Sequence, residues 1–310
     1  MTELAPQELR VLVAVAEAGG FSAAAHRLGI TQSAVSHSVR GSEAKVGAVL
    51  FDRGRAGASP TPAGERAVAL GRRILRLYEV LGAEARAAGR AAAGPGTAEG
   101  VLRIAAFRSA ALHLLPPALE RLAARHPGVR PEIRVVRELG PGTAGEVAAG
   151  RADLAIATLS GPASGPPSGP PSGPSGLPDG LPDGLLSGEL TREAYSLVHP
   201  AGHPDPKALP LLDWDENCGS YTRDWWRAQD WIPRATVKAE DDAMVLTMVG
   251  RGLGMAILPE LSLREATDAV EIAGLGPQGP VRRVGYVTTP ELASTLAVRA
   301  LIRELRAERG

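Results

Sequence analysis

The stretch FSAAAHRLGITQSAVSHSVRG (residues 21–41) predicts two short helices joined by a tight turn. Gly29 suits the turn, because a residue with a Cβ atom resists the left-handed conformation that ends many helices. Thr31 is a good N-cap for the second helix. Ala34, Val35 and Val39 form the apolar side of that helix, so the polar side chains between them are expected to point outward. These polar residues are Gln32, Ser33, Ser36, His37 and Arg40.

The free face of this second helix predicts contact with DNA. Two short helices joined by a glycine-containing turn, the second with small polar residues on its exposed side, fit the major groove of B-DNA. Gln32 can pair with adenine through a donor and an acceptor, and Ser36 can bind any base. Ser22, the expected N-cap of the first helix, and Thr31 are better placed for phosphates, because helix N-termini attract anions.

The flanking residues complete a winged unit. Upstream, an apolar side between Leu9 and Ala16 predicts a further helix that Gly19 stops. Downstream, the short polar segment from Arg53 to Pro62 is rich in glycine and serine, which is typical of a two-stranded wing. Arg53 and Arg55 in this wing are expected to reach phosphates or a narrow minor groove.

A long helix follows the wing. From Ala63 to about Arg90, apolar residues recur at steps of three and four, among them Leu70, Ile74 and Leu77. Such a helix is too long to pack alone. Its apolar stripe is therefore expected to meet the same helix of a second subunit.

The remainder of the chain alternates strands and helices. After a Gly and Pro linker at Ala93–Glu99, strands are predicted at Val101–Ala106, Val129–Val136 and Asp153–Ala157, with helices between them, so the sheet should be parallel. Repeats such as GPPSGPPSGPSG predict a disordered insert at 160–188. A second α/β lobe follows, and the last strand and helix return to the first lobe. Two crossovers then leave a hinged cleft.

The first turn of this domain is a candidate ligand site. The chain leaves a strand at Ala106 and enters a helix at about Ser109, so backbone N–H groups there open toward the cleft. Arg108 beside them would favour an anionic ligand. The alternative is that Ser109 only caps its helix.

Composition narrows the functional class. Residues 1–94 hold 12 Arg and Lys against 8 Asp and Glu, whereas the rest holds 22 against 26, so only the front end is basic. No apolar run reaches the roughly 18 residues that cross a bilayer, and the N-terminus lacks a basic leader, so we expect a cytoplasmic protein with no membrane partner. Cys218 is the only cysteine, which excludes an intrachain disulfide.

The order of these motifs resembles the LysR-type transcriptional regulators. The resemblance rests on LRVLVAVAEAGGFSAAAHRLGITQSAVSHSVRGSEAKVGAVLFDR, PTPAGE and a helix, then GVLRIAAFRSAALHLLPPALERLAARHPGV, AAGRADLAIAT and MVGRGLGMAILP. It covers most of the chain outside the insert. The sequence departs from the family pattern at Ser33, where proline is usual, at Gly41 and Ser42, which replace a basic residue and a leucine, and at His37, where arginine is common.

The resemblance implies an α+β multidomain fold: a winged helix-turn-helix, a long linker helix and a two-lobed α/β effector domain like the periplasmic binding proteins. The expected segments are a DNA-binding domain at 1–62, a linker and dimerisation helix at 63–92, one lobe at 100–159 and 281–310, the insert at 160–188, and the other lobe at 189–280. Effector contacts would come from both lobes: Phe107, Arg108, Ser109, Ala110, Thr158, Cys218, Gly219, Ser220 and Asp241.

The implied partners follow from the same resemblance. We expect a promoter or operator with dyad symmetry, a second copy of the chain in a homodimer or homotetramer through residues 63–92, and RNA polymerase. No cofactor is expected, only a small-molecule co-inducer of unknown identity. The main rival is a small-molecule binding protein whose N-terminal helices no longer recognise a specific operator.

Other chemistries are disfavoured. The sequence has no GxSxG elbow, phosphate loop or paired catalytic carboxylates, so we expect no enzyme and no catalytic residue. His199 and His203 have the spacing of a metal pair, but Pro200 breaks the helix that a pair at this spacing needs. The glycines from Gly250 to Gly254 follow a helix and precede a strand, the reverse of a dinucleotide fingerprint. Cys218 has no resolving partner, so a structural thiol is favoured over a redox sensor.

Overall fold

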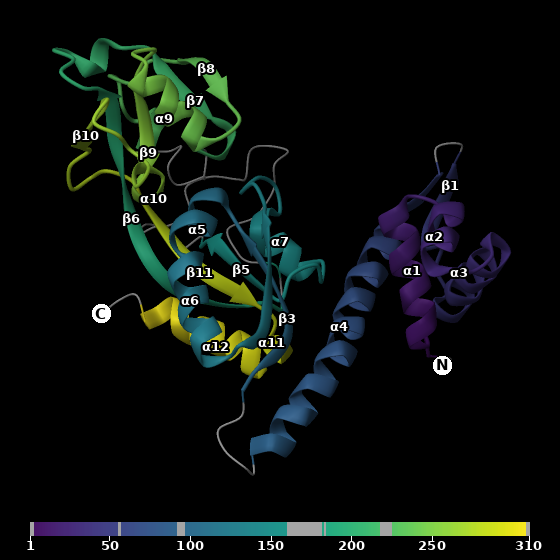
Figure 1. Cartoon of the computed structure of the whole chain (residues 1–310). Helices are drawn as coiled ribbons and strands as arrows, with labels where there is room; N and C mark the ends of the chain where they lie inside the picture. Colours follow the sequence, from purple (N-terminus) through teal and green to yellow (C-terminus); the bar gives the residue numbers. More distant parts are fainter. Residues whose placement is uncertain are drawn as a thin grey trace.

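The computed structural model describes residues 3–54, 57–91, 97–159, 182, 184–217 and 225–307, with only the backbone described at positions 53, 90, 91 and 217. A small helical unit and a larger body built on a sheet are joined by one long helix (Figure 1). No helix in the described part of the chain is both long and apolar enough to span a membrane.

Three helices form the N-terminal unit: α1 (Pro6–Ala18), α2 (Phe21–Leu28) and α3 (Gln32–Val46). Gly29 ends α2 with φ 66°, which permits the tight turn before α3. Leu12, Val15, Val35 and Val39 are almost completely buried and form the centre of this unit. The predicted periodicity thus places the apolar side of each helix inward, except at Ala34, which was predicted to face inward and is exposed.

Two short strands follow as an antiparallel pair, β1 (Phe51–Gly54) and β2 (Gly57–Pro60). The pair begins two residues before the predicted wing, at Phe51, whose buried ring lies 6.4 Å from that of Phe21. Burial of this aromatic side chain fixes the base of the wing on the helical core.

Helix α4 (Pro62–Ala91) has 30 residues. Its first turn lies tightly against the end of the core: a Cβ atom at Gly64 would come within 1.9 Å of the Leu50 carbonyl oxygen, so only glycine fits there. Further along, one side of α4 exposes an apolar stripe of Leu70, Ile74, Leu77, Tyr78 and Leu81.

The first lobe of the body, lobe I, is a parallel βαβαβ unit, as predicted. Its strands are β3 (Glu99–Ala106), β4 (Gly128–Val135) and β5 (Leu154–Thr158), and β3 pairs in parallel with both neighbours. Its helices are α5 (Arg108–His113), α6 (Leu115–Arg125) and α7 (Gly142–Ala148). Two prolines lie in the first turn of α6, where a missing N–H leaves no hydrogen bond unmade.

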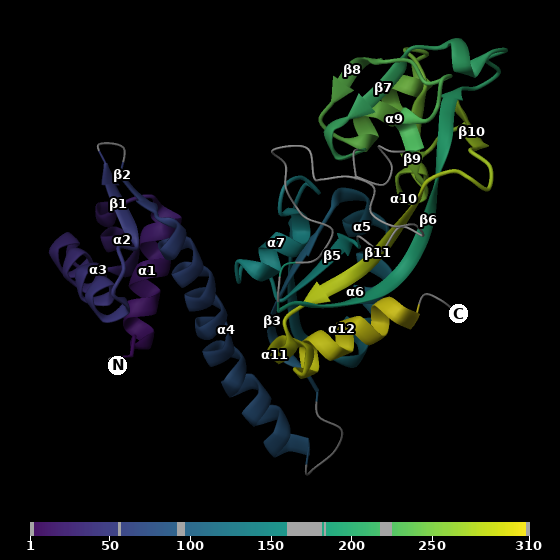
Figure 2. The same ribbon diagram turned by 180° about the vertical axis from the view of Figure 1, so that it is seen from behind.

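Two long strands connect the lobes, β6 (Leu186–Pro200) and β11 (Val281–Thr288) (Figure 2). They pair antiparallel with each other, and β11 pairs antiparallel with β5. The sheet is therefore mixed and not wholly parallel. The predicted boundary at 188/189 is wrong, because residues 186–188 already belong to β6 and pair with β11. Most of the predicted insert, residues 160–181 and 183, lies outside the described residues.

Lobe II is built on the far end of β6. β9 (Ala256–Pro259) and β10 (Val270–Gly274) pair with β6, and β7 (Leu211–Trp214) pairs in parallel with β8 (Ala235–Ala239). The helices are α9 (Asp242–Gly250) and α10 (Glu260–Leu263), with short 3-10 turns at Pro206–Ala208 and Asp215–Asn217. Strands β7, β8 and β10 were not predicted from the sequence.

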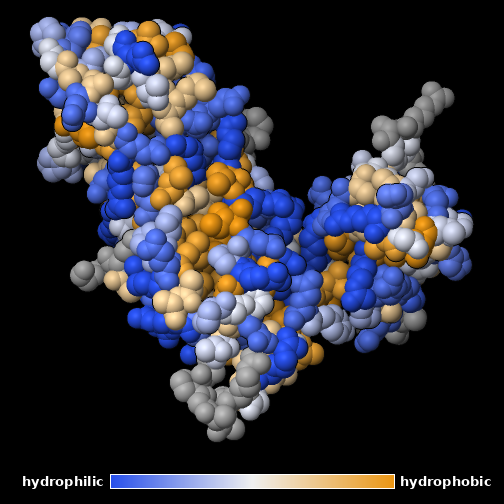
Figure 3. Space-filling model, viewed as in Figure 1, coloured by the Kyte–Doolittle hydropathy of each residue, from blue (hydrophilic) through white to orange (hydrophobic). Residues whose placement is uncertain are grey.

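The C-terminal segment forms two helices, α11 (Pro290–Ala293) and α12 (Leu296–Arg306), where one was predicted. Ser294 and Thr295 donate their hydroxyls to the carbonyls of Glu291 and Leu292, at 2.6 and 2.7 Å. The two hydroxyls bond to backbone carbonyls that would accept backbone N–H groups in a continuous helix, so the chain turns before α12. Figure 3 shows an apolar surface over the region of α5 and α6, where Leu112 is 45% exposed.

Candidate DNA-reading surface and effector site

The start of α3 is fixed by its cap. The Thr31 hydroxyl accepts a hydrogen bond from the Ala34 N–H at 3.2 Å, as expected for an N-cap. Thr31 Oγ1 also lies 3.0 Å from the Ser33 hydroxyl. The turn and the cap therefore hold the first residues of α3 in one conformation at the surface.

Gln32, Ser33, His37 and Arg40 are exposed on α3. Arg40 Nε donates to the Ser36 carbonyl at 3.2 Å, so the guanidinium folds back along its own helix and stays at the surface. These four side chains form the outward face of α3. They lie on one helix, within nine consecutive positions.

Ser36 does not belong to that face. It is only 8% exposed, contrary to the prediction that it points outward. Ser36 directly follows Val35 and precedes Val39 by three positions, so it lies at the edge of the apolar stripe that faces the core. Ser42, where the family pattern has leucine, is completely buried, and its hydroxyl donates to the Ser38 carbonyl at 2.9 Å.

The remaining predicted DNA contacts differ in their outcome. Ser22 is not an N-cap: Gly20 takes that position, and Ser22 lies inside the first turn of α2. The extended backbone of Gly20 starts the helix two residues earlier than predicted and allows Phe21 to pack against the core. The side chain of Arg53 and all of Arg55 lie outside the described residues.

The predicted effector residues of lobe I surround the start of α5. Phe107, Ser109 and Ala110 are buried, and Thr158 at the end of β5 is half-buried. The Arg282 guanidinium lies 4.6 Å from the centre of the Phe107 ring. The Phe107 ring is thus packed beneath a cation. Phe107, and not Ser109, is the N-cap of α5, so the alternative that Ser109 caps this helix is wrong.

Arg108 spans the junction between the lobes. Its guanidinium donates to Asp242 at 3.0 Å and to Glu265 at 2.8 Å, and both carboxylates belong to lobe II. The Asp242 carboxylate also accepts the Ser262 hydroxyl. The two carboxylates raise the pKa of Arg108, against the lowering effect of its burial. The predicted anionic ligand would need the positive charge of Arg108 to be free, but Asp242 and Glu265 already pair with it.

A second arginine joins the lobes in the same way. Arg137, just after β4, donates to Asp215 at 3.0 Å and to Glu216 at 3.4 Å. The neighbouring Glu138 N–H donates to Glu216 at 3.1 Å. Two arginines of lobe I therefore each contact a pair of carboxylates in lobe II. Sequence reasoning missed Arg137 and Asp242, and their places just after a strand and at a helix start were the only available signals.

The Glu138 carboxyl is enclosed at this junction. It accepts hydrogen bonds from the Thr143 N–H at 3.1 Å and the Thr143 hydroxyl at 2.5 Å. Burial raises the pKa of Glu138 in spite of these bonds and of the Arg282 charge. Burial likewise raises the pKa of Glu216. The junction thus holds carboxyl groups that are costly to ionise.

The other predicted lobe II residues are only partly described. Asp241 caps α9, where its carboxylate accepts the Met244 N–H at 2.8 Å. Cys218, Gly219 and Ser220 lie outside the described residues. His199 Nδ1 lies 3.1 Å from the Pro200 carbonyl, and no cluster of metal-ligating side chains is present in the ranges that the structure describes.

Helix α4 is attached to lobe I by a buried ion pair. Arg76 donates to both carboxylate oxygens of Asp153 at 2.7 Å, and to the Val101 carbonyl at 2.6 Å. Asp153 also accepts the Arg103 N–H at 2.9 Å and leads directly into β5. Strand β5, which ends at Thr158, is thus linked at its other end to α4, the helix that follows the N-terminal helical unit.

Comparison with known proteins identifies both parts. Residues 6–65 match the bacterial regulatory helix-turn-helix protein of the lysR family, and residues 95–310 match the LysR substrate binding domain. A relative from Synechococcus elongatus named "Probable HTH-type transcriptional regulator LrrA" is 33% identical over 302 residues, which cover 94% of this chain and 92% of the relative.

Solved structures have the same fold along the whole chain. LysG from Corynebacterium glutamicum, with bound effector arginine, has a TM-score of 0.63 at 21% identity and covers 98% of this chain and 99% of its own. CbnR in complex with its target DNA has a TM-score of 0.60 at 19% identity, with the same coverage. The chain belongs to the LysR family of bacterial helix-turn-helix transcriptional regulators, with an effector-binding domain, and is not an enzyme.

Proposed function

We propose that this regulator reads its operator with the outward face of α3. The observation that carries the proposal is the exposure of Gln32, Ser33, His37 and Arg40 on a helix whose first turn is already capped. Polar side chains at the start of a recognition helix can reach base edges in the major groove. Thr31, Ser22, Arg53 and Arg55 would contribute phosphate or minor-groove contacts, and buried Ser36 would act through the position of its neighbours.

The proposed assembly is a homodimer or homotetramer formed through α4. The stripe on α4 leaves Ile74 43% and Leu81 64% exposed in a single chain, and a second copy of the helix would cover them. Two copies related by a twofold axis would read an operator with dyad symmetry. Acting at a promoter in the cytoplasm, the assembly would contact RNA polymerase.

The proposed effector is a small molecule bound where the lobes meet. Its contacts would be Phe107–Ala110, Thr158, Cys218–Ser220 and Asp241. Arg108 and Arg137 support a control point here, because both bridge to the opposite lobe. An effector that prefers one lobe arrangement would shift the population toward it. Because the Arg76–Asp153 pair joins lobe I to α4, a change in the lobe arrangement would change the position of α4.

Gel shifts with the promoter of the chain's own gene test operator reading. Gln32→Ala should weaken operator binding by roughly 1 to 3 kcal/mol and leave binding to unrelated DNA almost unchanged, because a lost base contact removes discrimination. Ser36→Ala should have a smaller effect. The control is Glu120→Gln, an exposed position in lobe I.

Equal losses for Gln32→Ala on every sequence would contradict base reading. Binding that ignores sequence and disappears at moderate salt would favour the rival class, a small-molecule binding protein without a specific operator.

A further inference from the structure

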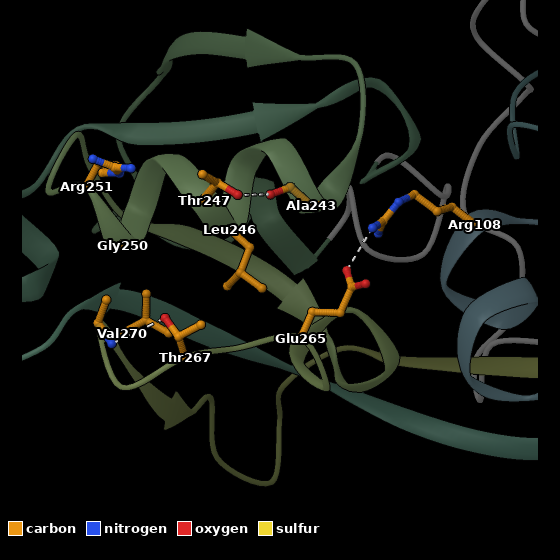
Figure 4. Close-up of a pocket in the computed structure, with 10 residues that line it drawn as sticks. Arg108, Ala243, Leu246, Thr247, Gly250, Arg251, Glu265, Thr267 and Val270 are labelled. Atoms are coloured by element: carbon orange, nitrogen blue, oxygen red, sulfur yellow. Dashed lines mark hydrogen bonds and ion pairs between the residues drawn. The ribbon is translucent and has the colours of Figure 1, made fainter.

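A groove of about 400 Å³ runs along lobe II between α9 and residues 264–270 (Figure 4). It touches the predicted effector residues only at Arg108. Its other lining residues belong to lobe II: Ala243, Leu246, Thr247, Gly250, Arg251, Glu265, Thr267, Ala269 and Val270. No residue that was singled out from the sequence for a binding role, other than Arg108, lines it.

The long walls of the groove are aliphatic. Ala243, Leu246 and Gly250 follow one another at steps of three and four along one side of α9. Ala269 and Val270 lie opposite, where a Cβ atom at Gly250 would be 3.4 Å from Ala269 Cβ. The Thr247 hydroxyl donates to the Ala243 carbonyl at 2.9 Å, so its hydrogen is already used within the helix. Such walls suit a hydrocarbon stem.

One end of the groove carries a trio of charged side chains, Arg108, Asp242 and Glu265. Arg108 provides one positive charge, whereas Asp242 and Glu265 provide two negative charges. Both oxygens of Asp242 are used, one by Arg108 and one by Ser262. Glu265 uses Oε2 for Arg108, and its Oε1 accepts no hydrogen bond from the residues that the structure describes. Glu265 is 32% exposed, so a ligand can reach this oxygen.

The opposite end carries a positive charge. Arg251 directly follows α9, is exposed, and forms no ion pair with the described residues. Eight helical positions separate Ala243 from Arg251, a rise of about 12 Å. The groove is therefore long and narrow, with opposite charges at its two ends.

We propose that this groove binds a linear aliphatic cation. Its protonated amine or guanidine donates to Glu265 Oε1, and its stem lies along Leu246 and Val270. Arg108 keeps both of its carboxylates, and the added cation neutralises the surplus charge of this trio. A carboxylate at the far end of the ligand gains an ion pair with Arg251, so a zwitterion binds more tightly than a simple amine.

Calorimetric titration of the full chain with three six-carbon probes tests this proposal. Hexylamine, 6-aminohexanoate and hexanoate share a stem and differ only in their charged ends. We expect 6-aminohexanoate to bind most tightly, hexylamine to bind more weakly, and hexanoate to show no binding. The proposal would be overturned if hexanoate bound as tightly as hexylamine. It would also be overturned if neither hexylamine nor 6-aminohexanoate bound.

Substitutions locate the site. Glu265→Gln should weaken 6-aminohexanoate at least tenfold, and Ala243→Met, which narrows the groove and keeps every charge, should also weaken it. Arg251→Ala should weaken 6-aminohexanoate about threefold and leave hexylamine unchanged. Glu120→Gln, which removes a carboxylate far from the groove, should change nothing, and thermal melting checks that every variant is folded.

Unchanged affinities in both Glu265→Gln and Ala243→Met would place the ligand elsewhere and overturn the assignment. These titrations contain no DNA. If the titrations fail while operator binding is intact, only the ligand assignment to the groove is wrong. If the gel shifts show no operator discrimination, the proposed function is wrong and the ligand assignment is unaffected.

Discussion

The outward face of α3 and the lobe junction are built in opposite ways. The exposed side chains of α3 come from one helix, between Gln32 and Arg40, and the cap and turn that hold them are within a few residues. At the junction, Arg108 pairs with Asp242 and Glu265, which lie 134 and 157 positions away in the sequence. The proposed DNA-reading surface is local and open, whereas the junction is assembled from distant elements.

This difference changes what a substitution measures. On α3 a side chain can be removed with little effect on the fold, so a loss of DNA binding reports on contact. At the junction the same residues hold the lobes together, and any ligand must add to or replace internal ion pairs. Three predictions probe the link between these regions and then each region in turn.

The largest effect is expected at the link between the two regions. Asp153→Asn leaves the buried Arg76 guanidinium with only Glu79, at 3.0 Å and half exposed, as a charged partner. We expect the free energy of unfolding to fall by about 3 kcal/mol, because removal of one partner strands a buried charge. Urea titration of the full chain measures this loss.

Arg86→Ala is the matched control, because it breaks the Arg86–Glu99 pair, in which the arginine is 63% exposed. That loss should stay below about 1 kcal/mol. Equal effects of the two substitutions would show that the buried pair is no stronger an attachment of α4 than a surface contact.

The lobe junction should show its own pH dependence through Glu138. Because burial raises the pKa of Glu138 in the folded protein, the folded state binds this proton more tightly than the unfolded chain. The stabilising contribution is complete below the unfolded value of about 4.5 and is lost as pH rises through the higher folded value. Each pKa unit of difference corresponds to about 1.4 kcal/mol.

Glu138→Gln removes this titration. The stability of the variant relative to the natural protein should therefore increase with pH above 4.5. Urea midpoints at several pH values measure the trend, with Glu120→Gln as the exposed control. A difference that stays constant with pH would show that Glu138 ionises freely in the folded protein.

The smallest effect is expected on the inner side of α3. The Ser42 hydroxyl bonds to the Ser38 carbonyl of its own helix, so Ser42→Ala strands no distant partner. Alanine has the higher helix propensity, and we expect a gain of about 0.5 kcal/mol in the free energy of unfolding. A loss larger than about 1 kcal/mol would mean that the buried hydroxyl holds the helix in place.

Sequence patterns predicted much of the local structure and less of the long-range structure. The N-cap of α3 and the glycine turn depend on nearby residues and agree with the prediction. The parallel order of β3, β4 and β5 also agrees, because the alternation of strands and helices predicts it. Strand β6 was missed at its start, because residues 186–188 look like the repeats before them and become a strand only by pairing with β11. Ser36 was misplaced because periodicity gives the direction of a side chain and not what covers it.

By itself, the sequence determined most of the helical phase, the glycine turn and N-cap before α3, and the family of this regulator. These properties depend on hydrogen bonds and apolar contacts within a few positions of the chain. Only the tertiary structure decided that Arg108 is already paired, that Ser36 is covered, and that a groove with oppositely charged ends lies beside α9. Ion pairs and burial are settled where distant segments meet, and no short stretch of sequence encodes the distance between two atoms on different lobes.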